Sequence, residues 1–181
     1  MADKYQPSTE LWSWAHRSVD MVPHVRHLQH LATHVHSIIE WGIRSGVSTW
    51  ALLDGLPADG TYFGVDNVDI REGLPARIRE DPRVTIVIGD DREVELPDHA
   101  DMVMIDSSHE YEHTLQELDI AVRLAPDMIV MHDYLFWSPD PAHGWHWCKV
   151  HQAVDKWLET GSYHIDHLYY SQWGLLVLVP N

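Results

Sequence analysis

The sequence lacks several features that would point to particular classes of protein. Its 181 residues include one cysteine, Cys148, so no internal disulfide can form and nothing indicates an oxidising compartment. No apolar run approaches the roughly 18 residues needed to cross a bilayer, and residues 1–12 lack the apolar stretch of a signal peptide. No tract of low complexity interrupts the chain. We therefore expect one globular domain over residues 1–181, in the cytoplasm and away from membranes.

Basic residues are scarce as well. The 12 lysines and arginines face 28 aspartates and glutamates, which gives a formal net charge of −16. Because each phosphate contact normally requires a basic side chain, this balance argues against nucleic acid and anionic membranes as partners. Histidine, by contrast, occurs 15 times and offers many potential ligands and proton carriers. A homodimer stays open.

Short apolar runs alternate with amphipathic ones from residue 36 onward. Strands are expected over 36–42, 61–66, 83–90, 100–106 and 127–133, and helices over 47–56, 70–81, 111–125 and 151–161. Fully apolar strands separated by helices are typical of a parallel sheet covered on both faces. The last two strand-like runs, 162–170 and 173–180, are only a couple of residues apart and predict an antiparallel hairpin. The predicted fold class is α/β, a three-layer αβα sandwich with a seven-stranded, mostly parallel sheet that ends in this hairpin.

The chain before the first strand reads differently. Residues 8–35 predict two helical pieces broken at Pro23, so we expect residues 1–35 to form a helical cap on a ligand-binding core over 36–181. His24, His27, His30 and His34 would lie in one stripe of this cap. Solvated histidines or histidines at the rim of a substrate site fit better than a zinc site, because no acid or cysteine completes the ligand set.

Ligands of open parallel sheets collect at the carboxyl ends of the strands, so the residues that end each strand are informative. Gly42 and Gly46 follow the first strand, where they allow a tight turn and a close approach of the backbone to a ligand. Their Gly-x-x-x-Gly spacing differs from the Gly-x-Gly-x-x-Gly of a pyrophosphate turn. This difference weakens the hypothesis of a nicotinamide oxidoreductase.

The segment from Glu40 to Thr49 reads Glu-x-Gly-x-x-x-Gly-x-Ser-Thr. It resembles the first motif of class I S-adenosylmethionine-dependent methyltransferases, in the branch with the cephalosporin hydroxylase-like and macrocin-type O-methyltransferases. The resemblance implies a Rossmann-like fold and S-adenosyl-L-methionine as cofactor. It also implies contacts of the methionine part with Glu40, Gly42, Gly46 and Ser48, of the ribose hydroxyls with Asp66, and of the adenine amino group with Asp90 or Asp91. Taken singly, each of these residues could instead serve a turn or a helix cap.

The ends of the fourth and fifth strands carry Asp106 and the pair His132 and Asp133. Adjacent parallel strands lie about 4.8 Å apart, so these side chains would project into one cleft and could bind a divalent cation. Metal-dependent O-methyltransferases show a similar arrangement, with an aspartate after strand four and an acidic pair after strand five. The resemblance implies Mg²⁺ or another divalent cation at Asp106, His132 and Asp133, although His132 departs from the usual acid or amide.

His109 lies one turn beyond Asp106 in an Asp-x-x-His spacing. Methyl transfer to a hydroxyl requires removal of its proton, and a positioned base supplies that step. Macrocin-type enzymes resemble this spacing and imply that His109 is the base; the alternative is that His109 caps the helix starting near Tyr111. His113 could face either way. The acids of this helix are expected on its solvated face: Glu110, Glu112, Glu117 and Asp119.

The loop over 134–147 is rich in aromatic residues. It could line a pocket for a flat or hydrophobic acceptor, or fold back as a small satellite core. The sequence therefore predicts an S-adenosylmethionine-dependent, divalent-metal-dependent O-methyltransferase acting on a natural-product, sugar or phenolic hydroxyl. Two alternatives stay open: a metal-independent methyltransferase of the same fold, and a non-catalytic protein that binds the cofactor or regulates a partner.

Overall fold

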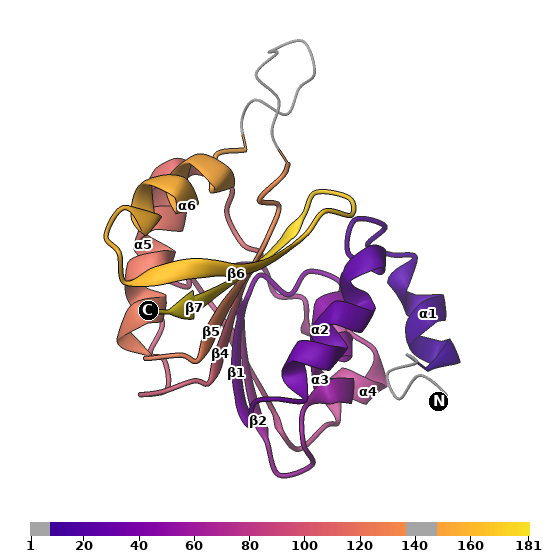
Figure 1. Cartoon of the computed structure of the whole chain (residues 1–181). Coiled ribbons are helices and arrows are strands. Elements are labelled where there is room, and N and C mark those ends of the chain that lie inside the picture. The colour runs from indigo at the N-terminus through magenta and orange to yellow at the C-terminus, as the bar shows by residue number, and fades with distance from the viewer. Residues whose placement is uncertain (1–7, 137–147) are drawn as a thin grey trace.

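A computed structural model describes residues 8–136 and 148–181. Its centre is a seven-stranded sheet with the order β3-β2-β1-β4-β5-β7-β6 (Figure 1). The strands are β1 Ser37–Trp41, β2 Thr61–Asp66, β3 Val84–Ile88, β4 Met102–Ile105, β5 Met128–His132, β6 Tyr163–Tyr169 and β7 Leu175–Pro180. Strands β1 to β5 pair in parallel, whereas β7 is antiparallel to both β5 and β6. The predicted mostly parallel sheet with a terminal hairpin is confirmed.

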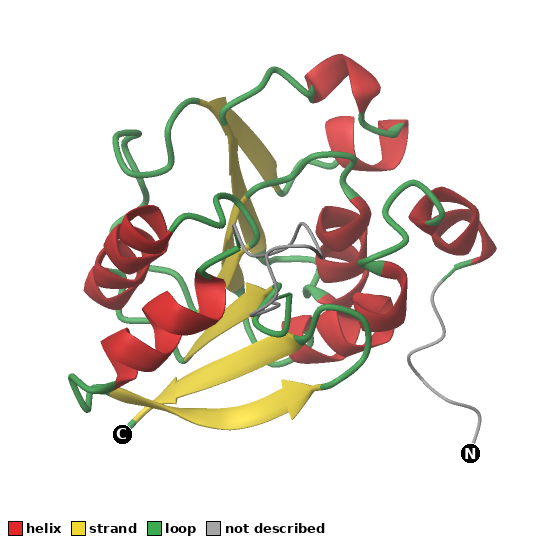
Figure 2. Ribbon diagram, turned by 90° about the horizontal axis from the view of Figure 1, so that it is seen from above, coloured by secondary structure: helices red, strands yellow, loops and turns green. Residues whose placement is uncertain are grey.

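Helices cover both faces of the sheet (Figures 1 and 2). The helical segments are α1 Thr9–Ala15, η1 Val22–His24, α2 Val25–Ala32, α3 Val47–Gly55, η2 Arg71–Gly73, α4 Ala76–Arg79, α5 Tyr111–Arg123 and α6 Val150–Leu158. Helices α1 to α4 pack on one face, and α5 and α6 pack on the other. This arrangement is the predicted three-layer sandwich.

The core is divided by the sheet because side chains alternate along each strand. Ile38 belongs to the cluster under α2 and α3, whereas its neighbour Ile39 belongs to the cluster under α5 and α6. Both are about 1% exposed, so the two faces of β1 are equally buried. Burial on both faces explains why the central strands read as continuous apolar runs.

Two expected elements differ in detail. The helix expected over 70–81 is split into η2 and α4 on either side of Pro75, because proline has no N–H to continue a helix and disfavours helical backbone in the residue before it. In the hairpin, residues 170–174 separate β6 from β7, a longer connection than expected. Gly174 turns the chain there with φ +82°. Within the described residues, no helix is long and apolar enough to cross a membrane.

The N-terminal segment forms helical pieces as predicted, but the break lies over residues 16–21 and not at Pro23, which is the second residue of the short helix η1. They are tied to the loop after β1. The Trp14 indole donates a hydrogen bond to the carbonyl of Ser45 at 2.8 Å, and Arg44 forms an ion pair with Asp20 at 2.8 Å. The segment therefore packs directly beside the glycine-containing turn.

Candidate active site

A cavity of about 740 Å³ opens at the carboxyl ends of the parallel strands. Its size falls in the range of small-molecule and cofactor sites. The loops after all five parallel strands contribute to its wall. Its polar and aromatic lining includes Asp20, Arg44, Asp66, Asn67, Asp90, Asp91, Asp106, Ser107, Ser108, His109, His113, Asp133, Phe136 and Trp173.

The turn after β1 is fitted tightly against the end of β4. Gly42 adopts φ +88°, and a Cβ added to it would lie 2.1 Å from the carbonyl oxygen of Asp106. Only glycine satisfies both conditions. The Asp66 carboxylate holds the same turn, since its Oδ2 accepts hydrogen bonds from the backbone N–H groups of Ile43 at 3.0 Å and Arg44 at 2.8 Å. Gly42, Asp66 and Asp106 thus share one wall of the cavity.

Three residues of the predicted cofactor motif lie behind this wall and do not line the cavity. The Glu40 side chain is fully buried, where its carboxylate accepts hydrogen bonds from Thr49 and Tyr62. Burial raises the pKa of Glu40 to about 7, although its hydrogen-bond donors oppose the shift. Gly46 caps α3 with φ +74°, and Ser48 is buried in the first turn of that helix. Their contact with a cofactor stays a prediction.

The loop after β3 contributes a second acidic group to the cavity, Asp90 and Asp91. Asp90 is clamped by Arg92, with Oδ1 2.8 Å from Nε, and these hydrogen bonds hold the pKa of Asp90 well below its usual range. Asp91 is mostly buried and accepts a hydrogen bond from His113 Nε2 at 2.9 Å. His113 therefore faces the cavity, which answers the question that its position in the sequence left open.

Glu117 was expected on the solvated face of its helix, and this prediction was wrong. The side chain is fully buried, with Oε1 accepting a hydrogen bond from Ser107, and burial raises its pKa well above the usual value. The signal was present in the sequence, because Thr114, Glu117 and Ala121 form an inward stripe at helical spacing. The other acids of the helix, Glu110, Glu112 and Asp119, are exposed as predicted.

The loops after β4 and β5 bring together Asp106, His109 and Asp133. Suitable donor atoms of these three side chains all lie within 4.8 Å of one another. His109 Nε2 lies 2.6 Å from Asp133 Oδ2. Helix α5 begins at Tyr111 with Glu110 as its N-cap, so the alternative that His109 caps this helix was wrong. Asp133 adopts φ +62°, a left-handed conformation that is uncommon for a side chain other than glycine and that concentrates at functional sites.

His132 lies deeper, at the end of β5. Its ring is 1% exposed, and Nδ1 lies 3.1 Å from Asp133 Oδ1 and 3.3 Å from Asp106 Oδ1. Burial by itself lowers the pKa of His132, but the two carboxylates outweigh it and raise the pKa to about 10. The imidazoles of His109 and His132 in turn hold the pKa of Asp133 below its usual range, against the opposing effect of burial.

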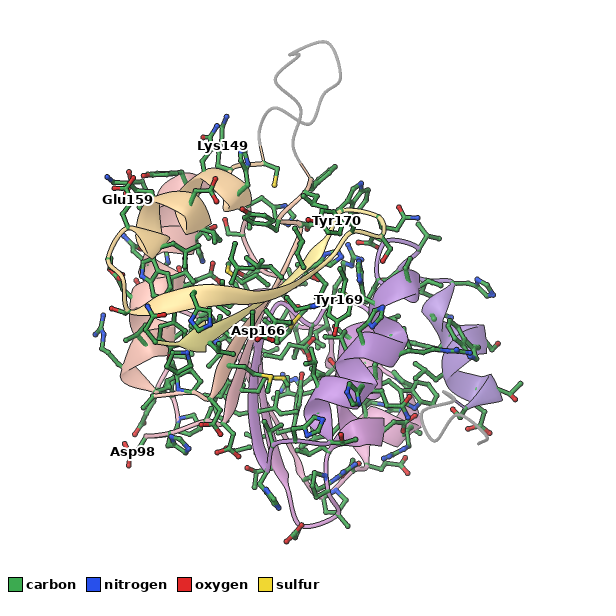
Figure 3. All side chains as sticks on the ribbon, in the orientation of Figure 1. Asp98, Lys149, Glu159, Asp166, Tyr169 and Tyr170 are labelled. Atoms are coloured by element: carbon green, nitrogen blue, oxygen red, sulfur yellow. The ribbon has the colours of Figure 1, made fainter. Side chains whose placement is uncertain are left out.

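The histidine stripe of the N-terminal segment separates into buried and exposed members. His30 and His34 are exposed, as predicted for solvated histidines, with ring centroids 5.0 Å apart. His27 stacks on Tyr169 at 3.8 Å, at the end of β6 that faces α2 (Figure 3). His24 is fully buried against His132, with centroids 5.2 Å apart, so the solvated interpretation is wrong for this residue. Among the described residues, the stripe forms no group of metal ligands.

Aromatic side chains close the cavity from two distant parts of the sequence. Phe136 is buried and packs on Trp173, with ring centroids 4.3 Å apart. Trp173 lies in the loop between β6 and β7, and sequence reasoning missed it because nothing nearby in the chain marks it as part of a site. The remainder of the predicted aromatic loop, including Trp137, Trp145 and Trp147, lies outside the described residues.

The strand order, the antiparallel hairpin beside β5 and the cavity at the carboxyl ends together define a class I methyltransferase fold. A family model described as a methyltransferase domain matches residues 39–134, more than half of the chain. The chain therefore belongs to this methyltransferase family. The predicted fold and the predicted class, S-adenosylmethionine-dependent methyltransferases, are confirmed.

Solved structures agree with this fold. The chain is similar to the SAH-bound methyltransferase PaMTH1 of Podospora anserina, at 16% identity and a TM-score of 0.72, over 97% of this chain and 89% of that one. It is also similar to the O-methyltransferase of Bacillus cereus in complex with SAH, at 17% identity and a TM-score of 0.72, over 99% of this chain and 94% of that one. A third similar structure is the SAM-bound O-methyltransferase TomG of Streptomyces achromogenes, involved in tomaymycin synthesis, at 16% identity and a TM-score of 0.72, over 98% of this chain and 92% of that one. No curated protein sequence matches the chain.

Proposed function

We propose that this chain transfers a methyl group from S-adenosylmethionine (SAM) to a hydroxyl group of a small molecule, with a divalent cation such as Mg²⁺ bound beside the acceptor. One observation carries the proposal. A single cavity is lined both by the turn around Gly42 and Asp66 and by the cluster of Asp106, His109 and Asp133. A cofactor at the first group and an acceptor at the second would therefore share one space. The neighbours named O-methyltransferases support the same chemistry.

The cofactor end would bind SAM through features that suit its parts. Among the described residues, Asp66 Oδ1 accepts one hydrogen bond, from Val68 N–H at 2.9 Å, so it retains acceptor capacity for a ribose hydroxyl. Asp91, which lines the cavity after the neighbouring strand β3, offers a carboxylate oxygen to an exocyclic amino group. SAM supplies a methyl group on a positively charged sulfur. The acidic lining of the cavity suits that charge.

Replacing Gly42 with alanine should weaken binding of S-adenosylhomocysteine (SAH), the product of SAM, by roughly tenfold or more. The new Cβ would clash with the Asp106 backbone at a φ that alanine disfavours, which displaces the whole turn. Calorimetry with SAH measures the effect. Gly73→Ala is the matched control, because a Cβ there has no atom within 4 Å. Gly161→Ala tests the backbone effect alone, since its φ is +73° in open space. Equal SAH affinity in all three variants would contradict the role of the turn.

At the chemical end, His109 would take the proton of the acceptor hydroxyl. With Nε2 protonated and 2.6 Å from Asp133 Oδ2, Nδ1 is the basic nitrogen of the ring. A bond would form between the acceptor oxygen and the methyl carbon while the bond between that carbon and sulfur breaks. The hydroxyl proton would pass to His109, and Asp133 would stabilise the resulting imidazolium. Phe136 and Trp173 give this end apolar walls, which suit a flat or hydrophobic acceptor such as a phenol or a natural-product intermediate.

The cluster also fits a divalent cation. Asp106 Oδ1 and Asp133 Oδ1 each lie close to His132 Nδ1, and Asp133 Oδ1 is buried without a hydrogen bond among the described residues. The 3.1 and 3.3 Å separations between His132 Nδ1 and the two carboxylate oxygens would let these side chains hold one cation. A cation held there would lower the pKa of an acceptor hydroxyl. Asp133 would then bind the cation through Oδ1 and orient His109 through Oδ2.

A second candidate is a metal-independent methyltransferase. The observation that favours it is the place of the His132 ring, 3.1 Å from Asp133 and 3.3 Å from Asp106, where the two carboxylates raise the pKa of His132 to about 10 and an imidazolium can balance them without a cation. Removal of metals with a chelator separates the two candidates. Loss of turnover that a divalent cation restores supports the metal-dependent enzyme, and unchanged turnover supports the alternative.

The experiment that tests the proposed function combines binding and turnover. Calorimetry with SAH and SAM should show one site per chain, and release of SAH should be followed with sugar, phenolic and natural-product hydroxyl acceptors. Binding followed by methylation of an oxygen, established by mass spectrometry of the product, supports the proposal. Binding without turnover across the panel would favour a non-catalytic binding protein. Binding of NAD but not of SAH would exclude the proposal altogether.

A further inference from the structure

We infer that the cation site of this protein uses His132 as a nitrogen ligand and for that reason favours a transition-series dication, such as Mn²⁺ or Fe²⁺, over Mg²⁺. The inference rests on the proposed function, because it concerns the cation of that same site. It concerns a property that the neighbours' fold does not determine, namely which metal the donor atoms of this chain select.

The first argument is the state of the buried polar atoms. Both ring nitrogens of His132 and Oδ1 of Asp133 are buried and make no hydrogen bond within the described part of the chain. Nδ1 lies near two carboxylate oxygens, but without the alignment that a hydrogen bond requires. A buried polar group without a partner costs about 1–3 kcal/mol. A cation between these atoms would satisfy Nδ1 and Oδ1 together.

The second argument is that the protein holds the His132 ring in place by packing. The residue ends β5 in register with Leu175 of β7, so the backbone is fixed by the sheet. On the other side its ring meets the His24 ring edge-on, and His24 is itself fully buried. A ligand ring that is fixed before the metal arrives is the kind of preorganised donor that a metal site requires.

The third argument is ligand chemistry. Mg²⁺ binds through oxygen and retains several waters, whereas imidazole suits transition metals. A set of two carboxylates and one imidazole is therefore better matched to a transition-series ion. A cation at Nδ1 would also displace the proton held there, since a histidine ligand must be neutral.

Two groups of possible metal ligands occur in the described chain: Asp106, His109 and Asp133, whose two carboxylates both face His132, and separately Asp90, Asp91 and His113. Asp90, Asp91 and His113 already have partners within the protein, including the guanidinium of Arg92. Arg92 holds both oxygens of Asp90, and His113 Nε2 is bonded to Asp91. The group therefore lacks the unsatisfied nitrogen that marks His132, and we assign the site to the His132 group.

The test uses the full chain, stripped of metal and loaded with Mn²⁺ or Mg²⁺. Transition metals bind more tightly than Mg²⁺ to most sites, so a preference alone is not sufficient. Electron spin echo spectroscopy of the Mn²⁺-loaded wild-type protein should show the coupling of a directly bound imidazole nitrogen, and this coupling should be lost in His132→Asn and kept in His109→Gln. The ratio of Mn²⁺ to Mg²⁺ affinity, measured by equilibrium dialysis, should fall about tenfold or more in His132→Asn, which offers an amide oxygen instead. His113→Asn is the matched control and should leave the ratio unchanged.

Several results would overturn the inference. Bound Mn²⁺ without nitrogen coupling would show that His132 is not a ligand, even if His132→Asn fails to fold and gives no ratio. A ratio that changes in His113→Asn and not in His132→Asn would place the cation at Asp90 and Asp91. If neither metal binds, the inference fails and so does the metal-dependent form of the proposed function. Methyl transfer that persists in chelator would then leave the metal-independent enzyme in place.

Discussion

Replacing His109 with glutamine should lower the turnover number by about 10²- to 10⁴-fold while SAH binds with nearly unchanged affinity. Glutamine retains a donor that can reach Asp133, but it has no nitrogen that can accept a proton at neutral pH. His109 lies at the acceptor end of the cavity, with its ring centroid 6.1 Å from that of Phe136, so its loss leaves the turn at Gly42 and Asp66 intact. Steady-state rates and calorimetry with SAH measure the two effects separately.

His99 provides a matched control for this experiment. It too pairs with an aspartate, with Nε2 3.0 Å from Asp101 Oδ1, but it is half exposed and lies outside the cavity. His99→Gln should therefore leave turnover near the wild-type value. A turnover number for His109→Gln equal to that of His99→Gln would remove His109 from the role of base. Parallel losses of turnover and SAH affinity would instead indicate a structural role.

The fold could be predicted largely because its strands are buried on both faces. Short continuous apolar runs such as Met102–Ile105 are typical of strands buried on both faces, and their alternation with helices leaves few topologies. The positions of the strand ends followed from the same runs. They placed Asp66, Asp106 and Asp133 at one edge of the sheet, which is where the cavity lies.

The pairing within the site could not be predicted in the same way. The contact of His109 with Asp133 depends on the left-handed backbone at Asp133, which no residue type in the sequence announces. The burial of His24 against His132 joins segments more than a hundred residues apart through packing of the N-terminal helices. Such contacts depend on tertiary packing, whereas periodicity reports only on neighbours along the chain.

Replacing Asp133 with asparagine should lower turnover by about 10³-fold or more, because one carboxylate serves two functions. Its Oδ2 orients His109 at 2.6 Å, and its Oδ1 faces His132 at 3.1 Å in the proposed cation site. Asparagine tolerates the left-handed backbone at φ +62° and adds no strain there, but loss of the buried carboxylate beside His132 should lower the free energy of unfolding by about 3–5 kcal/mol. Thermal unfolding and steady-state rates measure the two quantities on the same preparation.

Comparison with Asp106→Asn separates the two functions of Asp133. Asp106 faces His132 at 3.3 Å as part of the proposed cation site, but the contact that orients His109 comes from Asp133. If Asp106→Asn only weakens binding of the cation, a large excess of Mn²⁺ should restore much of the turnover of this variant. The same excess should not restore Asp133→Asn, because its neutral amide no longer stabilises the His109 imidazolium. Full recovery of Asp133→Asn by metal would mean that this carboxylate acts only as a ligand, and His109 would then need another partner to orient it.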